Sequence, residues 1–258
     1  MYILKIIAKS FFNLLPVYSP LIYKIASRYV DRFNGDNNSE FESNGESRLL
    51  LSILCQLEGG VVFDIGANIG EWSKYCLGIS PQVELHLFEP SLLTYNELLK
   101  NTWSNNVHLN NFGLGEKEET LNLNIFDDAS GMNSLYARSG IGHHQIVKTE
   151  SVKIRTVDDY CNQHNIHRID FMKIDVEGHE LLVLKGAKQM LTEKRISMIQ
   201  FEYGGCNLDA RVYLRDIWDL LDTYDYKLAK IHPNKLYYFQ EYEQQLEVFK
   251  YSNWVAFS

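Results

Sequence analysis

The sequence lacks the clustered cations that mark proteins bound to nucleic acid. Its 258 residues contain 25 Lys and Arg against 33 Asp and Glu, which gives a formal charge of −8, and no dense basic cluster occurs in the body of the chain. Binding to a phosphate backbone depends on clustered cations. We therefore expect no nucleic-acid partner. The length suits one large domain with a substantial core.

Paired cysteines and long apolar runs are also missing. The four cysteines, Cys55, Cys76, Cys161 and Cys206, lie far apart and form no Cys-x-x-Cys pair, so neither a disulfide framework nor a zinc site is predicted. The uncharged stretch 10–23 is shorter than the roughly 20 residues that span a bilayer. No secretory signal is recognisable at the N-terminus. These absences predict a cytoplasmic protein with reduced thiols and no resident metal.

Residues 1–33 have the pattern of two amphipathic helices, and we assign 1–43 to an N-terminal helical extension and linker. Apolar residues recur at helical spacing, and Ser19-Pro20 supplies an N-cap and a first-turn proline for the second helix. Residues 1–30 carry four cations and no acid. One interpretation is a helical lid or a homodimer face; the other is a weak contact with a membrane surface.

From residue 44 to 258, short apolar strands alternate with helical segments. This order predicts an α/β fold, a doubly wound and largely parallel sheet with helices on both faces. The alternating apolar residues at 121–125 and 152–154 predict antiparallel additions at one edge of that sheet, and 127–147 is expected to be a long loop. The expected strands are 61–64, 83–88, 107–112, 169–174, 196–202, 226–231 and 252–257, and the expected helices are 69–78, 91–102, 157–164, 178–192 and 210–224.

The run from Val61 to Gly70 predicts a cofactor site. It reads as a buried strand ending in Asp64, a turn containing Gly66, and a helix that follows Gly70; the next strand ends in Glu89. Ligands of open parallel sheets lie beyond the carboxyl ends of the strands. Glycine allows close approach of the backbone to a ligand, and the free N–H groups of a helix start point towards it. The two acids therefore mark a site for an adenosine-containing cofactor.

The acids favour S-adenosylmethionine over a dinucleotide. A dinucleotide site is expected to show Gly-x-Gly-x-x-Gly, but Asn68 replaces the middle glycine here and would crowd a pyrophosphate. A carboxylate at the end of the first strand suits a cationic amine, and Glu89 can accept from a ribose diol. S-adenosylmethionine offers both groups.

A second block, residues 171–180, predicts the chemistry. It reads as a strand, an acidic turn holding Asp175 and Glu177, and a helix start with His179 and Glu180. Acids are favoured at a helix N-terminus. Three carboxylates and an imidazole within six residues nevertheless exceed what capping needs, so we place reactive groups here.

These blocks resemble the FkbM-type methyltransferases. The matching segments are 63–70, 88–90, 156–160, 173–180 and the strand end at 201–202, within a resemblance covering roughly residues 44–258. It implies a class I methyltransferase (Rossmann-like) fold of seven main strands in the order 3-2-1-4-5-7-6, with S-adenosylmethionine as cofactor. The predicted cofactor-binding residues are Asp64, Gly66, Ala67, Asn68, Gly70, Glu89, Phe112, Gly113 and Asp175.

Methyl transfer to an alcohol needs a base for the hydroxyl proton. Asp175 is the first candidate, with cofactor positioning as its alternative role; Glu177, His179 and Glu202 follow, and His232 ranks below them. A magnesium site built from Asp175, Glu177 and Glu202 is an alternative that the spacing does not require.

The expected acceptor is a hydroxyl of a sugar, as a nucleotide-sugar, a capsular polysaccharide or another surface glycan, because family members commonly methylate such groups. A secondary metabolite or a protein is the alternative acceptor. The rival class is a non-catalytic cofactor-binding module, in which the basic N-terminal helices do the main work.

Overall fold

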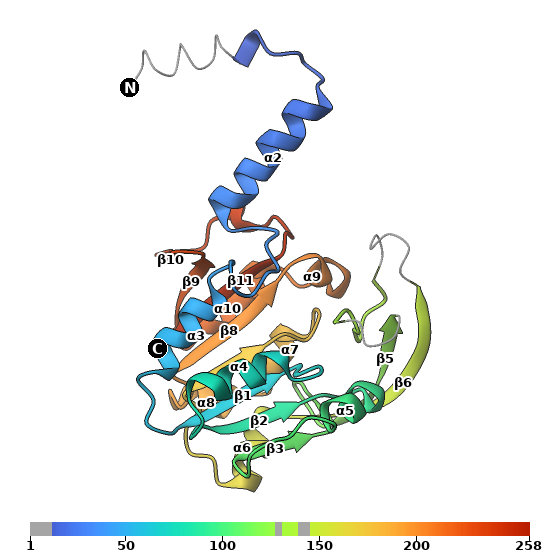
Figure 1. The fold of residues 1–258 in the computed structure, drawn as a ribbon, viewed down its shortest axis with the longest axis vertical. Coiled ribbons are helices and arrows are strands. Elements are labelled where there is room, and N and C mark those ends of the chain that lie inside the picture. Colours follow the sequence, from blue (N-terminus) through green and yellow to red (C-terminus); the bar gives the residue numbers. More distant parts are fainter. Residues whose placement is uncertain (1–11, 127–130, 139–144) are drawn as a thin grey trace.

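An eight-stranded mixed sheet runs through the centre of the molecule (Figure 1). The computed structural model describes residues 12–126, 131–138 and 145–258. The order across the sheet is β10-β9-β11-β8-β7-β1-β2-β3. The strands are β1 (Val61–Ile65), β2 (Glu84–Phe88), β3 (Val107–Asn110), β7 (Phe171–Ile174), β8 (Met198–Tyr203), β9 (Lys227–His232), β10 (Lys235–Tyr238) and β11 (Ser252–Phe257).

The strand order follows the class I methyltransferase expectation with one addition. Counted along the chain without β10, the main strands lie in the order 3-2-1-4-5-7-6. β11 runs antiparallel to both of its neighbours, β8 and β9. The eighth strand, β10, was not predicted. It forms a hairpin with β9 and extends that edge of the sheet.

A second sheet corrects the expected edge additions. β4 (Gly113–Leu114), β6 (Ile146–Arg155) and β5 (Glu119–Phe126) form a separate three-stranded sheet. The prediction of antiparallel pairing was right for β5 and β6, but these strands do not join the central sheet. Their alternating apolar residues bury one another in a small core of their own, formed by Leu123, Ile125, Val152 and Ile154. Part of the expected loop 127–147 lies outside the described residues.

The helices cover both faces of the central sheet. One apolar core joins residues of α3, α4 and α5 to one sheet face, and another joins residues of α6, α7, α8 and α10 to the opposite face. Alternate strand residues enter the two cores, as Val62 and Phe63 do. The helices are α3 (Glu46–Leu54), α4 (Glu71–Ile79), α5 (Leu92–Leu98), α6 (Val157–His164), α7 (Glu180–Lys185), α8 (Lys188–Thr192), α9 (Gly205–Ala210) and α10 (Leu214–Thr223), with a 3₁₀ turn at Gln244–Leu246.

One expected helix is divided in the structure, and another is shortened. The segment 178–192 breaks between α7 and α8 at Gly186, where a side chain would clash with the backbone of Gly115, because a Cβ would lie 1.9 Å from its carbonyl oxygen. The segment 210–224 begins later than expected. Arg211 adopts a left-handed conformation after α9, which separates that short helix from α10.

Helix α2 (Pro20–Asn34) projects from the body of the molecule (Figure 1). As predicted, Ser19 caps it and Pro20 starts it, but none of its residues is buried. Its apolar face is therefore open. Asp31 ties it to the body through Lys250, whose Nζ lies 2.6 Å from an Asp31 oxygen. The earlier expected helix lies largely within residues 1–11, outside the described ranges. Within those ranges, no helix has the length and apolar character needed to cross a membrane.

Candidate active site

The carboxyl ends of β1, β2 and β7 meet at a pocket. Ile65, the last residue of β1, pairs with Phe88 at the end of β2 and with Ile174 at the end of β7. The residues that follow these strand ends therefore come together. The pocket has an empty volume of about 780 Å³ and its polar lining consists chiefly of Asn68, Glu89, Asn133, Asp175, Glu177 and His179. This is the edge where the sequence predicted the cofactor.

Gly66 is required because the turn after β1 packs directly on the end of β7. It has a positive φ of 86°. A Cβ at this position would lie 1.8 Å from the carbonyl oxygen of Asp175. Its N–H and that of Ala67 both donate to the Phe88 carbonyl, at 3.0 Å each. Any side chain at position 66 would push the β1 turn away from Asp175 and open the site.

Asn68 links this turn to Glu89. Its backbone, left-handed at a φ of 49°, donates to a carboxylate oxygen of Glu89 at 3.0 Å. The side-chain Oδ1 of Asn68 is buried, and among the described residues it has no hydrogen-bond partner. Because unpaired buried polar atoms are unusual, this oxygen is ready to accept from a ligand in the pocket that Asn68 lines.

Glu89 lines the pocket while only 7% exposed. Its other oxygen accepts from the N–H of Ser91 at 2.9 Å. Burial raises the pKa of Glu89 to about 7, against the lowering effect of its two backbone hydrogen bonds. Each carboxylate oxygen keeps accepting capacity beyond these bonds. Glu89 can therefore accept from the pair of hydroxyls on a ribose, and this contact stays a prediction.

Asp64 is placed differently from the expectation. It is fully buried and does not line the pocket. Ser73 donates to it at 2.6 Å, and the Nζ of Lys173 lies 3.6 Å from its other oxygen. Burial raises its pKa, and the nearby Lys173 opposes that shift. Within the protein, the cation that faces Asp64 is thus Lys173, and a contact with a cofactor amine stays a prediction.

Lys173 is the residue that sequence reasoning missed. Its ammonium lies 3.0 Å from an oxygen of Asp175 and bridges that acid to Asp64. Burial lowers its pKa, but Asp175 and Asp64 outweigh the burial and hold the pKa above the usual value. Residues 173 and 175 share a direction because side chains alternate along a strand. The position of Lys173, two residues before Asp175, was the sequence feature that could have predicted this ion pair.

Asp175, Glu177 and Glu202 form a crowded group of acids, as predicted. Glu202 shares a hydrogen bond with Asp175, and burial with the charge of Asp175 raises the pKa of Glu202 well above its usual range. Oxygens of Glu177 and Glu202 and the sulfur of Cys206 lie within 4.8 Å of one another. Burial and the charge of Asp175 thus favour the protonated form of Glu202, and the Nζ of Lys173 lies 3.0 Å from Asp175.

Glu177 has a cationic partner that the sequence did not reveal. Arg138 approaches it at 2.5 Å, and both side chains are largely buried. Burial and the charge of Asp175 nevertheless raise the pKa of Glu177 to about 8. Glu180 supports the same turn: it is fully buried and accepts from the N–H of Gly178 at 3.0 Å and from Asn207 at 2.9 Å. Glu180 thus holds the acidic loop in place.

His179 lines the pocket as a neutral ring. It is 4% exposed, and its Nδ1 lies 3.0 Å from the hydroxyl of Tyr136. Burial lowers the pKa of His179 to about 4. An imidazole with so low a pKa is a weak base near neutral pH. Its catalytic role stays a prediction, and the structure ranks it below Asp175.

Three other predicted residues lie apart from this pocket lining. Phe112 packs its ring against Phe88, with centroids 5.7 Å apart, whereas the neighbouring Gly113 lines the pocket. Gly70 caps α4 and lies close to Trp103, 2.8 Å from the position of a Cβ. His232 lies against Gly35 at the base of α2 and outside the pocket.

A second hollow adjoins the first. The residues common to both are Gly66, Asn68 and Asp175. Its wall combines acids and Lys173 with aromatic rings, namely Phe41, Trp72, Tyr75 and Tyr251. Ala67 also lines it. Asp175 thus stands at the junction of two hollows, a position from which one side chain reaches the contents of both.

Known proteins share this sequence pattern. A model of the family described as "Methyltransferase FkbM domain" matches residues 64–228. Methyltransferase 1 of Beauveria bassiana is 29% identical over 142 residues, or 48% of this chain and 57% of that protein. The 2-O-methyltransferase NoeI of Sinorhizobium fredii is 26% identical over 178 residues, or 64% and 72% of the two chains.

The longest of these alignments is with a sugar-acid enzyme. The hexuronic acid methyltransferase AglP of Haloferax volcanii is 26% identical over 195 residues, which cover 72% of this chain and 76% of AglP. The alignments thus span between 57% and 76% of the relatives' own lengths.

Proposed function

The chain belongs to the methyltransferase FkbM domain family, and from that premise we propose that it transfers a methyl group from S-adenosylmethionine to a hydroxyl of a sugar. The observation that carries this proposal is the placement of Asp175 between two adjoining hollows. A methyltransferase needs such a junction, because the methyl donor and the acceptor must meet at one point. The name of NoeI, a 2-O-methyltransferase, supports transfer to an oxygen, and that of AglP, a hexuronic acid methyltransferase, supports a sugar acceptor.

The first hollow fits S-adenosylmethionine. Leu114, Ile154 and Pro90 give it apolar walls that suit an adenine ring, and Glu89 suits the ribose hydroxyls. The unpartnered Oδ1 of Asn68 supplies a further acceptor. When bound, S-adenosylmethionine supplies an electrophilic methyl group on a sulfonium. The protein's contribution is to hold an acceptor oxygen in line with that group and to take its proton.

We assign proton removal to Asp175. It is the most exposed member of its ion pair, with 35% of the side chain accessible against 9% for Lys173. Lys173 donates to the carboxylate at 3.0 Å and fixes its orientation, and Glu202 shares a hydrogen bond with it. Asp175 can thus accept the hydroxyl proton while its neighbours keep it aimed at the junction. Glu177, paired with Arg138, is the second candidate.

We place the acceptor in the second hollow. Sugar rings present apolar C–H faces and polar hydroxyl edges, so a matching site combines aromatic faces with hydrogen-bonding groups. Trp72 and Tyr75 offer such faces, and Glu46 and Glu71 offer carboxylates. A metabolite or protein hydroxyl is the alternative acceptor, and a nucleotide-linked sugar is the form we would supply first.

The rival predictions for residues 1–33, a membrane contact and a homodimer face, stay predictions. The exposure of the apolar face of α2 is compatible with either partner. Flotation with anionic vesicles and the oligomeric state in solution separate them. A lid over the active site is the third prediction for this segment.

The direct test is incubation of the full chain with S-adenosylmethionine labelled in the methyl group and a panel of nucleotide-sugars and hexuronic acids. We expect label in the sugar and an equal amount of S-adenosylhomocysteine. A thermal shift with S-adenosylhomocysteine but no label in any acceptor would favour the non-catalytic module. No thermal shift would contradict the cofactor assignment itself.

A further inference from the structure

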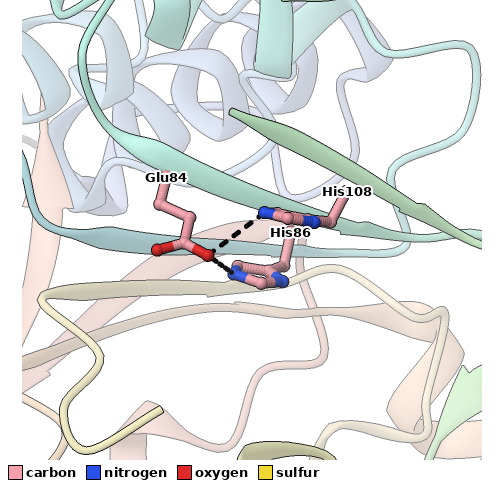
Figure 2. A group of neighbouring side chains, drawn as sticks. All are labelled: Glu84, His86 and His108. Atoms are coloured by element: carbon pink, nitrogen blue, oxygen red, sulfur yellow. Dashed lines mark ion pairs between the residues drawn. The ribbon is translucent and has the colours of Figure 1, made fainter. Parts of the chain in front are cut away.

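Three side chains of types that can bind a metal, Glu84, His86 and His108, converge on β2 and β3, towards the amino ends of these strands (Figure 2). Glu84 and His86 are two residues apart on β2, so their side chains point to the same face of the sheet. His108 on β3 is the register partner of His86 in the parallel pair. The topology of the sheet therefore brings all three to one place, away from the carboxyl ends that form the active site.

The ligand atoms are spaced as around a small cation. The Nε2 of His108 lies 3.1 Å from Oε1 of Glu84, and the Nε2 of His86 lies 3.3 Å from the same oxygen (Figure 2). Two ligand atoms that are each ~2.1 Å from a tetrahedral zinc ion lie about 3.4 Å apart. The separations from Glu84 therefore match the edges of a tetrahedral coordination shell.

His86 is buried and oriented in a way that suits a metal ligand. Its side chain is 1% exposed, and among the described residues its Nε2 has no hydrogen-bond partner. The other ring nitrogen, Nδ1, lies 2.8 Å from the hydroxyl of Tyr160. Such an outer hydrogen bond fixes the orientation of metal-bound imidazoles. A buried ring with Nδ1 fixed, and with Nε2 facing Glu84 at 3.3 Å without a hydrogen bond from the described residues, points to a ligand at Nε2.

We propose that Glu84, His86 and His108 form a site for one zinc ion, with water completing the coordination. Two imidazoles and a carboxylate are a ligand set that d¹⁰ zinc accepts in sites with three protein ligands and one open position. Glu84 and His108 are 48% and 42% exposed, which gives the ion an entry path from solvent. Because the site joins the edge strand β3 to β2, the ion would stabilise the fold and leave the active site unchanged.

Binding requires one local movement. The two imidazole rings are stacked, with centroids 4.4 Å apart and an angle of 12° between their planes. An ion bound in the plane of both rings needs one ring to turn. His108 is the more exposed of the two, so we assign the turn to His108 and keep His86 fixed by Tyr160.

The test uses untagged full-length protein and zinc chloride alone. We expect one zinc ion bound per chain and a rise in the temperature of unfolding on its addition. His108→Ala and Glu84→Gln are the test variants because both side chains are partly exposed and leave the core intact. Each should weaken zinc binding at least tenfold, since even the loss of an outer partner of a metal ligand costs ~10–100-fold in affinity, and should abolish the thermal shift.

His164→Ala is the matched control. Its ring centroid lies 6.4 Å from that of His86, but it is not a member of the cluster, so zinc binding should be unchanged. Cobalt(II) provides a second measurement, because the intensity of its visible absorption reports tetrahedral coordination. Unchanged zinc affinity in His108→Ala and Glu84→Gln, or the absence of any binding in the parent chain, would overturn the proposal.

Discussion

Two polar clusters lie on different strands of the same sheet, and they differ in how they balance charge. One is built on β1, β7 and β8, and the other on the amino-terminal parts of β2 and β3. The carboxyl-edge cluster consists of Asp64, Lys173, Asp175, Glu177 and Glu202. The His86 cluster consists of Glu84, His86 and His108. In the first cluster, acids outnumber the cation and most groups are buried. In the second, one exposed acid faces two imidazoles.

The difference shows that the place of a cluster in the sheet decides whether its groups suit proton transfer or metal binding. Buried acids in excess of cations hold their protons to higher pH than usual, as the raised pKa values of Glu177 and Glu202 indicate. Such groups suit proton transfer. In the His86 cluster, burial lowers the pKa of His86 to about 3, so its ring is neutral at physiological pH. A neutral imidazole suits metal binding and contributes little to proton transfer.

Asp175→Asn is expected to have the largest effect and would break the carboxyl-edge cluster. Removing a positioned general base slows a reaction ~10²–10⁴-fold, so turnover should fall at least 100-fold. The thermal shift with S-adenosylhomocysteine should persist if Asp175 acts on the acceptor. Glu84→Gln, in the other cluster, is the matched control and should keep full turnover. Full activity in Asp175→Asn would remove Asp175 as the base.

Lys173→Met tests whether the carboxyl-edge cluster depends on its central cation. Breaking a buried ion pair by removing one partner costs ~3–5 kcal/mol, and the loss should appear in urea unfolding. Lys227→Met is the matched control, because Lys227 pairs with Asp222 at 3.8 Å with both side chains more than 60% exposed. It should change stability by less than about 0.5 kcal/mol. Equal losses in the two variants would contradict a special role for Lys173.

Glu89→Gln tests the raised pKa at the pocket. Because the folded protein holds a proton on Glu89 from its usual pKa of 4.5 up to about 7, this group lowers stability as the pH rises through that window. The variant should lose this pH-dependent fall in stability. Relative to the parent, it should therefore gain up to about 3 kcal/mol of unfolding free energy between pH 4.5 and pH 7.5. Parallel stability profiles for the two proteins would show that the Glu89 pKa is not raised.

His108→Ala is expected to have the smallest effect, and it tests whether the His86 cluster is independent of the carboxyl-edge cluster. In metal-free buffer, the loss of a partly exposed pair should change stability by about 0.5 kcal/mol or less, and turnover should be unchanged. Urea unfolding with a chelator present measures the first, and the methyl-transfer assay the second. A large fall in turnover would mean that the two clusters act as one unit.

Much of the site could be predicted from sequence because its members follow strand ends. Asp175 and Glu89 come directly after apolar strands, and parallel strands gather their carboxyl ends at one edge. The same logic placed Gly66 beside the pocket. It also found the acids at 177 and 202, since one follows a strand end and the other lies near the end of β8. The correct order of strands in the sheet was enough to place these two acids near each other.

The rest depended on contacts between distant segments. The pairing of Arg138 with Glu177 joins residues 39 positions apart, and no local sequence pattern predicts it. The strands β4, β5 and β6 form a separate sheet. Alternation of apolar and polar residues predicts a strand but does not say which sheet that strand joins. Asp64 was predicted to face a ligand because it stands at the end of a strand. In the structure Ser73 and Lys173 are next to it, and a ligand contact stays a prediction.

The sequence by itself determined the seven main strands and their alternation with helices, the glycine turn and the acids at the strand ends, because periodicity, turn chemistry and strand direction are local properties. Tertiary structure alone decided which charges meet. It placed Lys173 between Asp64 and Asp175, set Asp175 at the junction of two hollows, and brought His108 opposite His86. Those outcomes depend on strand register and burial, which fix distances and solvent exposure only once the sheet is assembled.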